Sequence, residues 1–307
     1  FLIVITFFIT CSSSDESVEF IEVATCSDGI KNGTETAIDW GGTCVPCDIE
    51  VDIPAQGYDA QSSYAEYDLK WSDEFEGSEI DSEKWGYHIG TGCPNLCGWG
   101  NNEEQYFTNS TENAYIKDGN LIIKAKSDNI GGKSYSSSRL HTDNLYEFQY
   151  GRIDIRASMP SAAGTWVALF LLNKDYTIND PGAYWPSGGE IDIMEHVGNN
   201  QNVVSSALHN PSSFGNTTNK GEKTIATASS EFHVYAVDWM PKKMVFSVDG
   251  IPFYTYSPGS KNTENWPYTE DQFIILNVAM GGSFGGAIDP SFIESTMEVD
   301  YVRVYQK

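Results

Sequence analysis

Three carboxylates lie within six positions near the middle of the chain, in the run Glu190-Ile191-Asp192-Ile193-Met194-Glu195. Charged and apolar side chains alternate in this run, which is typical of a β-strand with its acids on one face. Like charges on one face repel each other and raise each other's pKa. Two close carboxyl groups, one of them held protonated, are what the cleavage of a glycosidic bond requires. The alternative is a polar edge strand of a soluble β protein, and the run alone does not decide between the two.

The spacing of the acids predicts an irregular strand. Glu190 and Asp192 share a face, whereas Glu195 lies three positions beyond Asp192 and would point to the other side. One extra residue, a β-bulge at Ile193 or Met194, would return Glu195 to the first face. Four strand steps span about 13 Å, while retaining glycosidases hold their carboxyl groups about 5–5.5 Å apart. The strand is therefore expected to curve.

Further motifs extend almost to the end of the chain. Trp185 lies shortly before the acids, and an indole is a surface on which a sugar ring can stack. The other motifs are Trp71-Ser72-Asp73-Glu74-Phe75, Gly98-Trp99-Gly100-Asn101-Asn102-Glu103, Tyr150-Gly151-Arg152-Ile153, Gly164-Thr165-Trp166, Phe232-His233-Val234-Tyr235, Val248-Asp249-Gly250, Ile275-Leu276-Asn277-Val278 and Met297-Glu298-Val299-Asp300-Tyr301. In order and spacing they resemble glycoside hydrolase family 16, and within it the laminarinase-like endo-β-1,3-glucanases. Met194, inserted before Glu195, is typical of that branch.

The resemblance implies a fold and a set of roles. The fold is a jelly roll whose concave sheet forms an open cleft, and the reaction retains the anomeric configuration. By position, Glu190 matches the nucleophile, Glu195 the general acid/base, and Asp192 the assisting residue between them. Glu190 must then be ionised, and Glu195 protonated, for the first step.

The same resemblance implies residues that contact the substrate. Each also has a structural alternative: Trp166 as a core residue, Arg139 as a surface charge, His209 as a strand histidine with its hydrogen bonds satisfied. Two positions depart from the family pattern, because Phe170 and Phe284 stand where many members carry Trp, which reduces the stacking surface. The predicted substrate-binding residues are Trp185, Trp166, Asn101, Glu103, Arg139 and His209.

A structural Ca²⁺ ion is also implied by the resemblance. Its ligands would be the backbone carbonyls of Glu74 and Gly119 and the carboxylate of Asp300. Oxygen-only ligation suits Ca²⁺. The ion would tie together the two ends of the sandwich, and no cofactor is expected for catalysis.

Composition and patterning favour one β-rich domain with appendages. The 307 residues include 28 Gly, 17 Tyr and 15 Phe, and the net charge of −25 argues against a nucleic-acid partner. Strand-like runs recur between Gly, Asn, Asp and Pro, and no long amphipathic helix is indicated. The Asp-Gly pair at 249–250 signals a tight hairpin. These features predict an all-β, antiparallel β-sandwich.

Three segments are expected. Residues 1–11 have the apolar character of a truncated secretion signal with a lipobox at Cys11, or of a plain cleaved signal. Residues 12–62 form an acidic linker around a short Cys-rich module, in which one of Cys26, Cys44 and Cys47 is expected to be unpaired. Acids in this module could hold Ca²⁺ or form a plain acidic turn. Residues 63–307 form the catalytic domain, where Cys93 and Cys97 are expected to close a small disulfide.

The predicted activity is the secreted, endo-acting hydrolysis of β-1,3-glucan, extending to mixed β-1,3/1,4-glucan. The alternatives are another polysaccharide of the family such as agar or porphyran, a transglycosylase, and a non-catalytic glucan-binding protein, which typically lacks the acids retained here. A monomer is expected, at the surface of a bacterium or released from it. Membrane contact is expected only through a lipid on Cys11.

Overall fold

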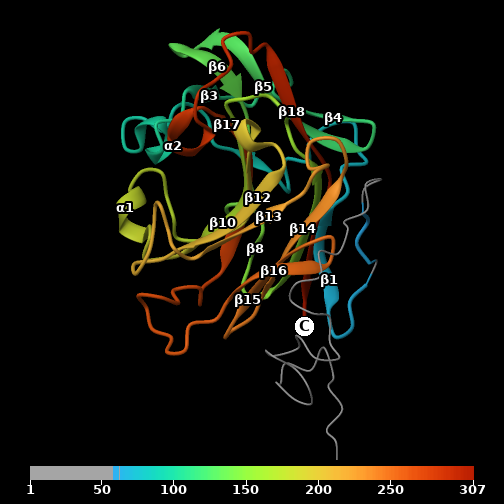
Figure 1. Ribbon diagram of the computed structural model, residues 1–307, viewed down its shortest axis with the longest axis vertical. Helices are drawn as coiled ribbons and strands as arrows, with labels where there is room; N and C mark the ends of the chain where they lie inside the picture. The colour runs from blue at the N-terminus through green and yellow to red at the C-terminus, as the bar shows by residue number, and fades with distance from the viewer. Residues whose placement is uncertain (1–57, 62) are drawn as a thin grey trace, which may run out of the picture. The chain divides into compact units, whose positions relative to one another are not determined.

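A computed structural model describes residues 58–61 and 63–307. The predictions for the signal and Cys11, for the Cys-rich module and for most of the acidic linker lie outside the described residues. The described part is almost entirely β-structure, arranged as two sheets packed face to face (Figure 1). The predicted all-β sandwich is therefore confirmed.

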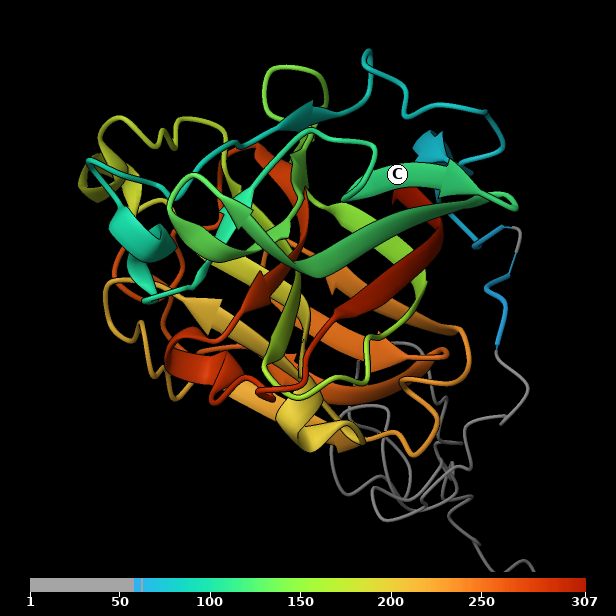
Figure 2. The ribbon, with the colours of Figure 1, turned by 90° about the horizontal axis from the view of Figure 1, so that it is seen from above.

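The larger sheet is the layer of the sandwich that does not carry the acid run. Strands β5 and β18, far apart in the sequence, lie side by side within it (Figure 2). Its pairings are antiparallel except for β3 with β6, which is parallel and departs from the prediction of an antiparallel sandwich. In spatial order the strands are β16 (Ile251–Tyr256), β15 (Met244–Val248), β14 (His233–Trp239), β9 (Gly151–Ser158), β18 (Glu294–Gln306), β5 (Asn120–Ile130), β6 (Lys133–Ser137) and β3 (Gln105–Phe107), with β1 (Asp68–Asp73) beside β18 and β4 (Ala114–Lys117) beside β5.

The second sheet carries the acid run. All its pairings are antiparallel, and β11, which holds the acids, lies between β10 and β12. Its strands are β13 (Lys220–Thr224), β12 (Val203–His209), β11 (Glu190–Val197), β10 (Thr165–Asn173), β17 (Gln272–Met280), β7 (Arg139–His141) and β2 (Gly86–Tyr87), with β8 (Glu147–Phe148) beside β17.

The helices are short. They are α1 (Pro181–Tyr184), α2 (Gly282–Gly285) and the 3₁₀ turns η1 (Cys97–Gly100) and η2 (Gly198–Asn200). Figure 1 shows α1 and α2 on the same side of the molecule, beyond the sheet that holds β10 and β12. Among the described residues, no helix has both the length and the apolar character needed to cross a membrane.

Alternation along the strands builds the core between the sheets. On β10, Val167, Leu169 and Leu171 are fully buried in the main apolar cluster. Trp166 and Ala168, at the intervening positions, line the opposite face of the sheet. Period-two side-chain direction therefore gives one sheet a dry face against its partner and a second face free to bind a ligand.

The predicted irregularity of β11 is present. Against β10, Leu169 pairs with Met194 and Phe170 pairs with Asp192, so Ile193 has no partner and forms a bulge. The register against β12 shifts over the same stretch, between Asp192 and Glu195. The predicted Asp249-Gly250 hairpin is also confirmed, since it joins β15 to β16.

Candidate active site

The bulge places the three acids on the open face of the sheet. Ile193 and Met194 are both packed in the core, so two consecutive side chains point inward there. Glu190, Asp192 and Glu195 all line the same cleft on the other face. A regular strand would have sent Glu195 into the core; one extra residue corrects its direction.

Each of the two glutamates accepts a hydrogen bond from an indole. Trp185 Nε1 donates to Glu190 Oε2 over 2.5 Å, and Trp166 Nε1 donates to Glu195 Oε1 over 3.0 Å. Trp166 lies on β10 and Trp185 immediately follows α1, so different elements fix the two carboxyl groups. Both predicted tryptophans are thus beside the acids, with their rings partly exposed.

Asp192 pairs with a histidine from the neighbouring strand. His209 Nε2 lies 3.0 Å from Asp192 Oδ2, and the Asp192 side chain is almost completely buried. His209 ends β12 and is in register with Glu190. Burial disfavours a charged imidazole, but the hydrogen bond and charge of Asp192 outweigh it and raise the pKa of His209 to about 9. The Asp192 charge therefore has a cationic partner at neutral pH.

Burial and mutual repulsion shift both glutamates. Burial, with the Asp192 charge added to it, raises the pKa of Glu190 to about 7. The same two causes raise the pKa of Glu195 to about 8. The order matters because the group expected to attack must lose its proton before the group expected to donate one. Both carboxyls therefore hold a proton at a higher pH than an exposed glutamate does, which suits the site to keep one of them protonated.

Arg139 brings a buried positive charge to the floor of the cleft. Its guanidinium lies over the rings of Trp99 and Phe170, 4.9 and 5.0 Å from their centroids. It donates to Asn277 Oδ1 over 3.3 Å and to His88 Nδ1 over 3.3 Å. It is 7% exposed, so it is a fixed part of the floor and the surface-charge alternative is wrong. Phe170, below it, is buried and offers no open stacking surface.

Asn101 and Glu103 lie in the loop that forms one end of the cleft. Glu103 is buried, and its carboxylate accepts hydrogen bonds from Gln105 over 2.6 Å and from Asn101 over 3.4 Å. Burial raises the pKa of Glu103, and the Arg139 charge opposes that shift. Both predicted loop residues therefore reach the cleft as part of one polar network.

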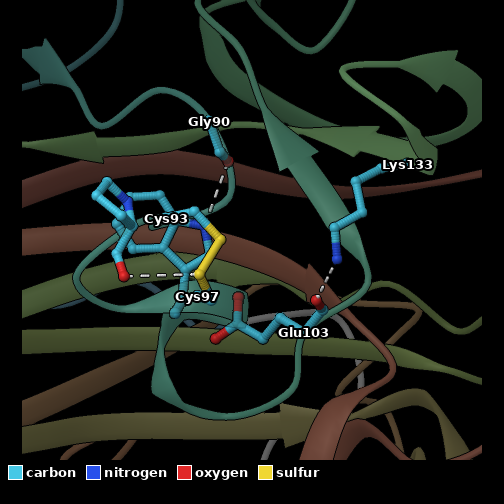
Figure 3. The surroundings of a disulfide bond; sticks show 7 residues. Gly90, Cys93, Cys97, Glu103 and Lys133 are labelled. Carbon is cyan, nitrogen blue, oxygen red and sulfur yellow. Dashed lines mark hydrogen bonds between the residues drawn. A yellow bond between two sulfur atoms is a disulfide. The ribbon is translucent and has the colours of Figure 1, made fainter.

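A disulfide closes the start of this loop. Cys93 and Cys97 are bonded, with 4.2 Å between their Cα atoms, which confirms the predicted pair. Beyond the bridge, Trp99 Nε1 donates to the carbonyl of Gly90, and Lys133 Nζ donates to the carbonyl of Glu103 (Figure 3). The bridge and these bonds hold the loop that presents Trp99 and Glu103.

The cleft is an open groove of about 920 Å³. Its floor is formed by alternate residues of β10, β11, β12 and β17, and its ends by the loop at 96–103 and the segment at 215–222. Sequence reasoning did not single out several lining residues. Two of them, Trp99 and Asn277, stand within the motifs that carry the resemblance, but neither was assigned a place in the cleft. The unpredicted lining residues include Trp99, Tyr176, Asn277, Lys220 and Glu222.

The strand register brings the segments of two predicted calcium ligands, Glu74 and Gly119, towards the part of β18 that holds the third, Asp300. Glu74 directly follows β1, whose Asp73 pairs with Val302. Gly119 directly precedes β5, whose Leu121 pairs with Val299. Since β9 takes the other edge of β18, both segments meet beside Asp300. One Asp300 oxygen accepts from Arg156 over 2.6 Å, and a third of the side chain stays exposed.

A carboxylate and two backbone carbonyls would be hard oxygen donors, of the type that Ca²⁺ prefers. Over the described residues, no cluster of three or more His, Cys, Asp or Glu side chains suits a metal. A site with one carboxylate and two carbonyls is not of that type.

Comparison with known proteins agrees with this geometry. The family model described as glycosyl hydrolases family 16 matches residues 101–303. A β-glucanase of Rhodothermus marinus is 39% identical over 262 residues, which cover 81% of this chain and 89% of the relative. Glucan endo-1,3-β-glucosidase A1 of Niallia circulans is 37% identical over 285 residues, 85% of this chain but 40% of the longer relative. The crystal structure of a laminarinase from Flavobacterium sp. UMI-01 superposes with a TM-score of 0.72 at 41% identity, covering 78% of this chain and all of that one.

Proposed function

The chain belongs to glycosyl hydrolase family 16, and on this premise we propose that it is a retaining endo-glycosidase that hydrolyses β-1,3-glucan. Mixed β-1,3/1,4-glucan is the second substrate we propose. One observation carries the proposal: a bulged strand presents Glu190 and Glu195 on the same face, on either side of Asp192, inside an open groove. The relatives described as β-glucanase, endo-1,3-β-glucosidase and laminarinase support the choice of glucan.

The proposed reaction has two steps. Glu190, ionised, attacks the anomeric carbon while the Glu195 proton passes to the departing glycosidic oxygen, leaving a glycosyl ester on Glu190. Glu195, now ionised, takes a proton from water, whose oxygen attacks the same carbon and releases Glu190. Burial and the Asp192 charge raise the pKa of Glu195, which supports its role as the proton donor.

The neighbours of the acids would act on this cycle. The Trp185 N–H favours the ionised form of Glu190, and the Trp166 N–H fixes the direction of the Glu195 carboxyl. The His209 charge balances Asp192, so that the triad does not gather three uncompensated charges. The groove is open along the sheet, which suits an internal site on a long chain. Its lining is partly aromatic and carries few positive charges, which suits a neutral polysaccharide.

Product analysis tests the proposal. Laminarin, lichenan and agarose are incubated with the protein, and the products are followed by chromatography and by NMR of the anomeric protons. We expect a ladder of laminari-oligosaccharides, with the β-anomer appearing first. Preference for agarose, or initial formation of the α-anomer, would contradict the proposal; products longer than the substrate would indicate transglycosylation. Glu190→Gln should release no reducing sugar while still binding laminarin, which separates an enzyme from a binding protein.

For the metal, we propose that Ca²⁺ binds beside Asp300 through its carboxylate and the carbonyls of Glu74 and Gly119, and that it stabilises the fold. Such an ion would join β1, the β4–β5 turn and β18 at one point. Chelation should lower the melting temperature, and Ca²⁺ should restore it. Asp300→Asn should remove this response, and an identical loss on chelation in that variant would argue against the site.

For the cellular location, we propose export to an oxidising compartment, as a secreted protein or a surface lipoprotein of a bacterium, acting as a monomer. The Cys93–Cys97 disulfide supports export, because such bonds persist where thiols are not kept reduced. Fractionation of cells that express the full chain, with radiolabelled palmitate to detect a lipid, tests the location. Light scattering tests the monomer.

A further inference from the structure

A phenylalanine that plays no part in the reaction described above lies against Trp185. The Phe214 ring meets the Trp185 ring edge to face, with 5.5 Å between centroids and 79° between planes. Phe214 belongs to the connection between β12 and β13, beside α1 (Figure 1). Phe214 itself is not among the residues that line the cleft, whereas the next residue, Gly215, is. The aromatic surface beside Glu190 therefore turns through nearly a right angle at this point.

The other glutamate has a matching arrangement. Trp166, which donates to Glu195, meets the Phe284 ring edge to face at 5.6 Å and 86°. Phe284 lies in α2 and lines the cleft. The catalytic acids are thus flanked by two aromatic corners, each made of an indole bonded to a carboxylate and a phenyl ring set across it.

Phe214 is exposed although its loop is tightly held. The ring is 51% exposed, whereas most large apolar side chains of the described residues are buried. At the base of the loop, the Asn210 side-chain amide donates to the hydroxyls of Tyr256 and Tyr268, both over 3.3 Å. Further along, Thr217 Oγ1 donates to the carbonyl of Leu208 over 2.9 Å. A rigid loop offers an aromatic face to a ligand with little loss of conformational entropy on binding.

We propose that Phe214 is a specificity-determining residue that stacks on a sugar of the bound glucan, next to the sugar held by Trp185. This proposal rests on the proposed function. It adds which conformation of the glucan chain the groove selects. Two platforms at nearly 80° suit consecutive rings that are turned relative to each other. A β-1,3 linkage turns the chain in this way, whereas β-1,4-linked rings follow a nearly straight, ribbon-like course. Phe214 therefore favours runs of β-1,3 linkages.

Kinetics on substrates of increasing length test this role. Phe214→Ala should raise KM for laminari-oligosaccharides that reach the corner about five- to tenfold, the size expected for one lost stacking contact of about 1–1.4 kcal/mol. The rise should be smaller for the shortest substrate that is cleaved and for mixed-linkage glucan, and KM should change more than kcat. Phe214→Trp should restore binding. Ile293→Ala, at an apolar side chain 75% exposed outside the cleft lining, is the matched control.

Two outcomes would overturn the role of Phe214. An equal loss at every chain length would make Phe214 only a support for Trp185, and an unchanged KM would remove it from the site. Calorimetric binding of laminarihexaose to Glu190→Gln, with and without Phe214→Ala, gives the same comparison without turnover. A failure of the wild-type protein to cut laminarin would refute the proposed function. The calorimetric comparison needs no turnover, so the effect of Phe214→Ala on hexaose binding could still be measured in that case.

Discussion

Replacing Glu195 by Gln should abolish hydrolysis and, at neutral pH, make the protein more stable. The reason is the environment that suits Glu195 to donate a proton: burial and the Asp192 charge raise its pKa from 4.5 to about 8. Between these values the folded protein holds a proton that the unfolded chain has released. Stability is therefore lost steadily as pH rises from below 4.5 towards 8. Glutamine has no proton to take up, and its Oε1 can still accept from Trp166.

The magnitude follows from the pKa difference. At pH 7 the unfolded carboxyl is about 2.5 pH units above its own pKa, while the folded one is still mostly protonated. Each pH unit corresponds to about 1.4 kcal/mol, so folding takes up the proton at a cost of about 3 kcal/mol. The variant should regain this amount, raising the melting temperature by about 5–10 °C for a domain of this size. At pH 4 both states are protonated and the gain should vanish.

Thermal and urea unfolding of the wild type and Glu195→Gln from pH 4 to pH 8 measures the effect. The exposed Glu264 provides a matched control, because Glu264→Gln removes a carboxylate from the surface. We expect the difference in unfolding free energy to grow with pH for Glu195→Gln and to stay near zero for Glu264→Gln. A gain that is the same at every pH would reflect packing alone. No gain at pH 7 would show that the Glu195 pKa is not raised and would refute the reasoning.

Three further predictions concern the pH dependence of hydrolysis. The profile of kcat/KM on laminarin should be bell-shaped, rising as Glu190 ionises near pH 7 and falling as Glu195 ionises near pH 8; an optimum below pH 5 would contradict the raised pKa values. Trp185→Phe keeps an aromatic ring but loses the N–H bonded to Glu190, so kcat should fall about tenfold or more and the acidic limb should move to higher pH, as expected for a lost bond to a charged group; an unmoved limb would mean that the bond does not act on Glu190. His209→Gln removes a positive charge that lowers the pKa of both glutamates, so both limbs should shift to higher pH, and a shift to lower pH would show that the charge acts differently.

The bulge in β11 was predictable from the sequence because its cause is local. Side chains alternate along a strand, so an acid displaced by one position either enters the core or requires an extra residue. The apolar runs predicted the sheets for the same reason, since period-two burial is a property of neighbouring residues. The parallel pairing of β3 with β6 was not predictable in this way, because it depends on which distant strand is left at the edge of the sheet.

The partners of the acids depend on contacts distant in the sequence. The resemblance placed His209 in the cleft, but its bond to Asp192 follows from the register of β11 against β12. Arg139 is buried with its guanidinium over the rings of Trp99 and Phe170, and this burial depends on residues that are distant in the sequence. Nothing in the residues around Phe214 indicates the perpendicular contact with Trp185, because that contact requires the fold of two separate loops.

Met194 links the stability of the strand to its chemistry. A bulge that turns Glu195 outward must also turn an additional side chain inward, so the core has to accept Ile193 and Met194 in succession. A branched residue at 194 would have few rotamers with which to fit beside Ile193, whereas unbranched methionine adapts to an irregular space. The direction of the Glu195 carboxyl therefore depends on how the opposite face of the strand is packed. Replacement of Met194 by a β-branched residue should disturb Glu195 even though residue 194 packs in the core and does not line the cleft.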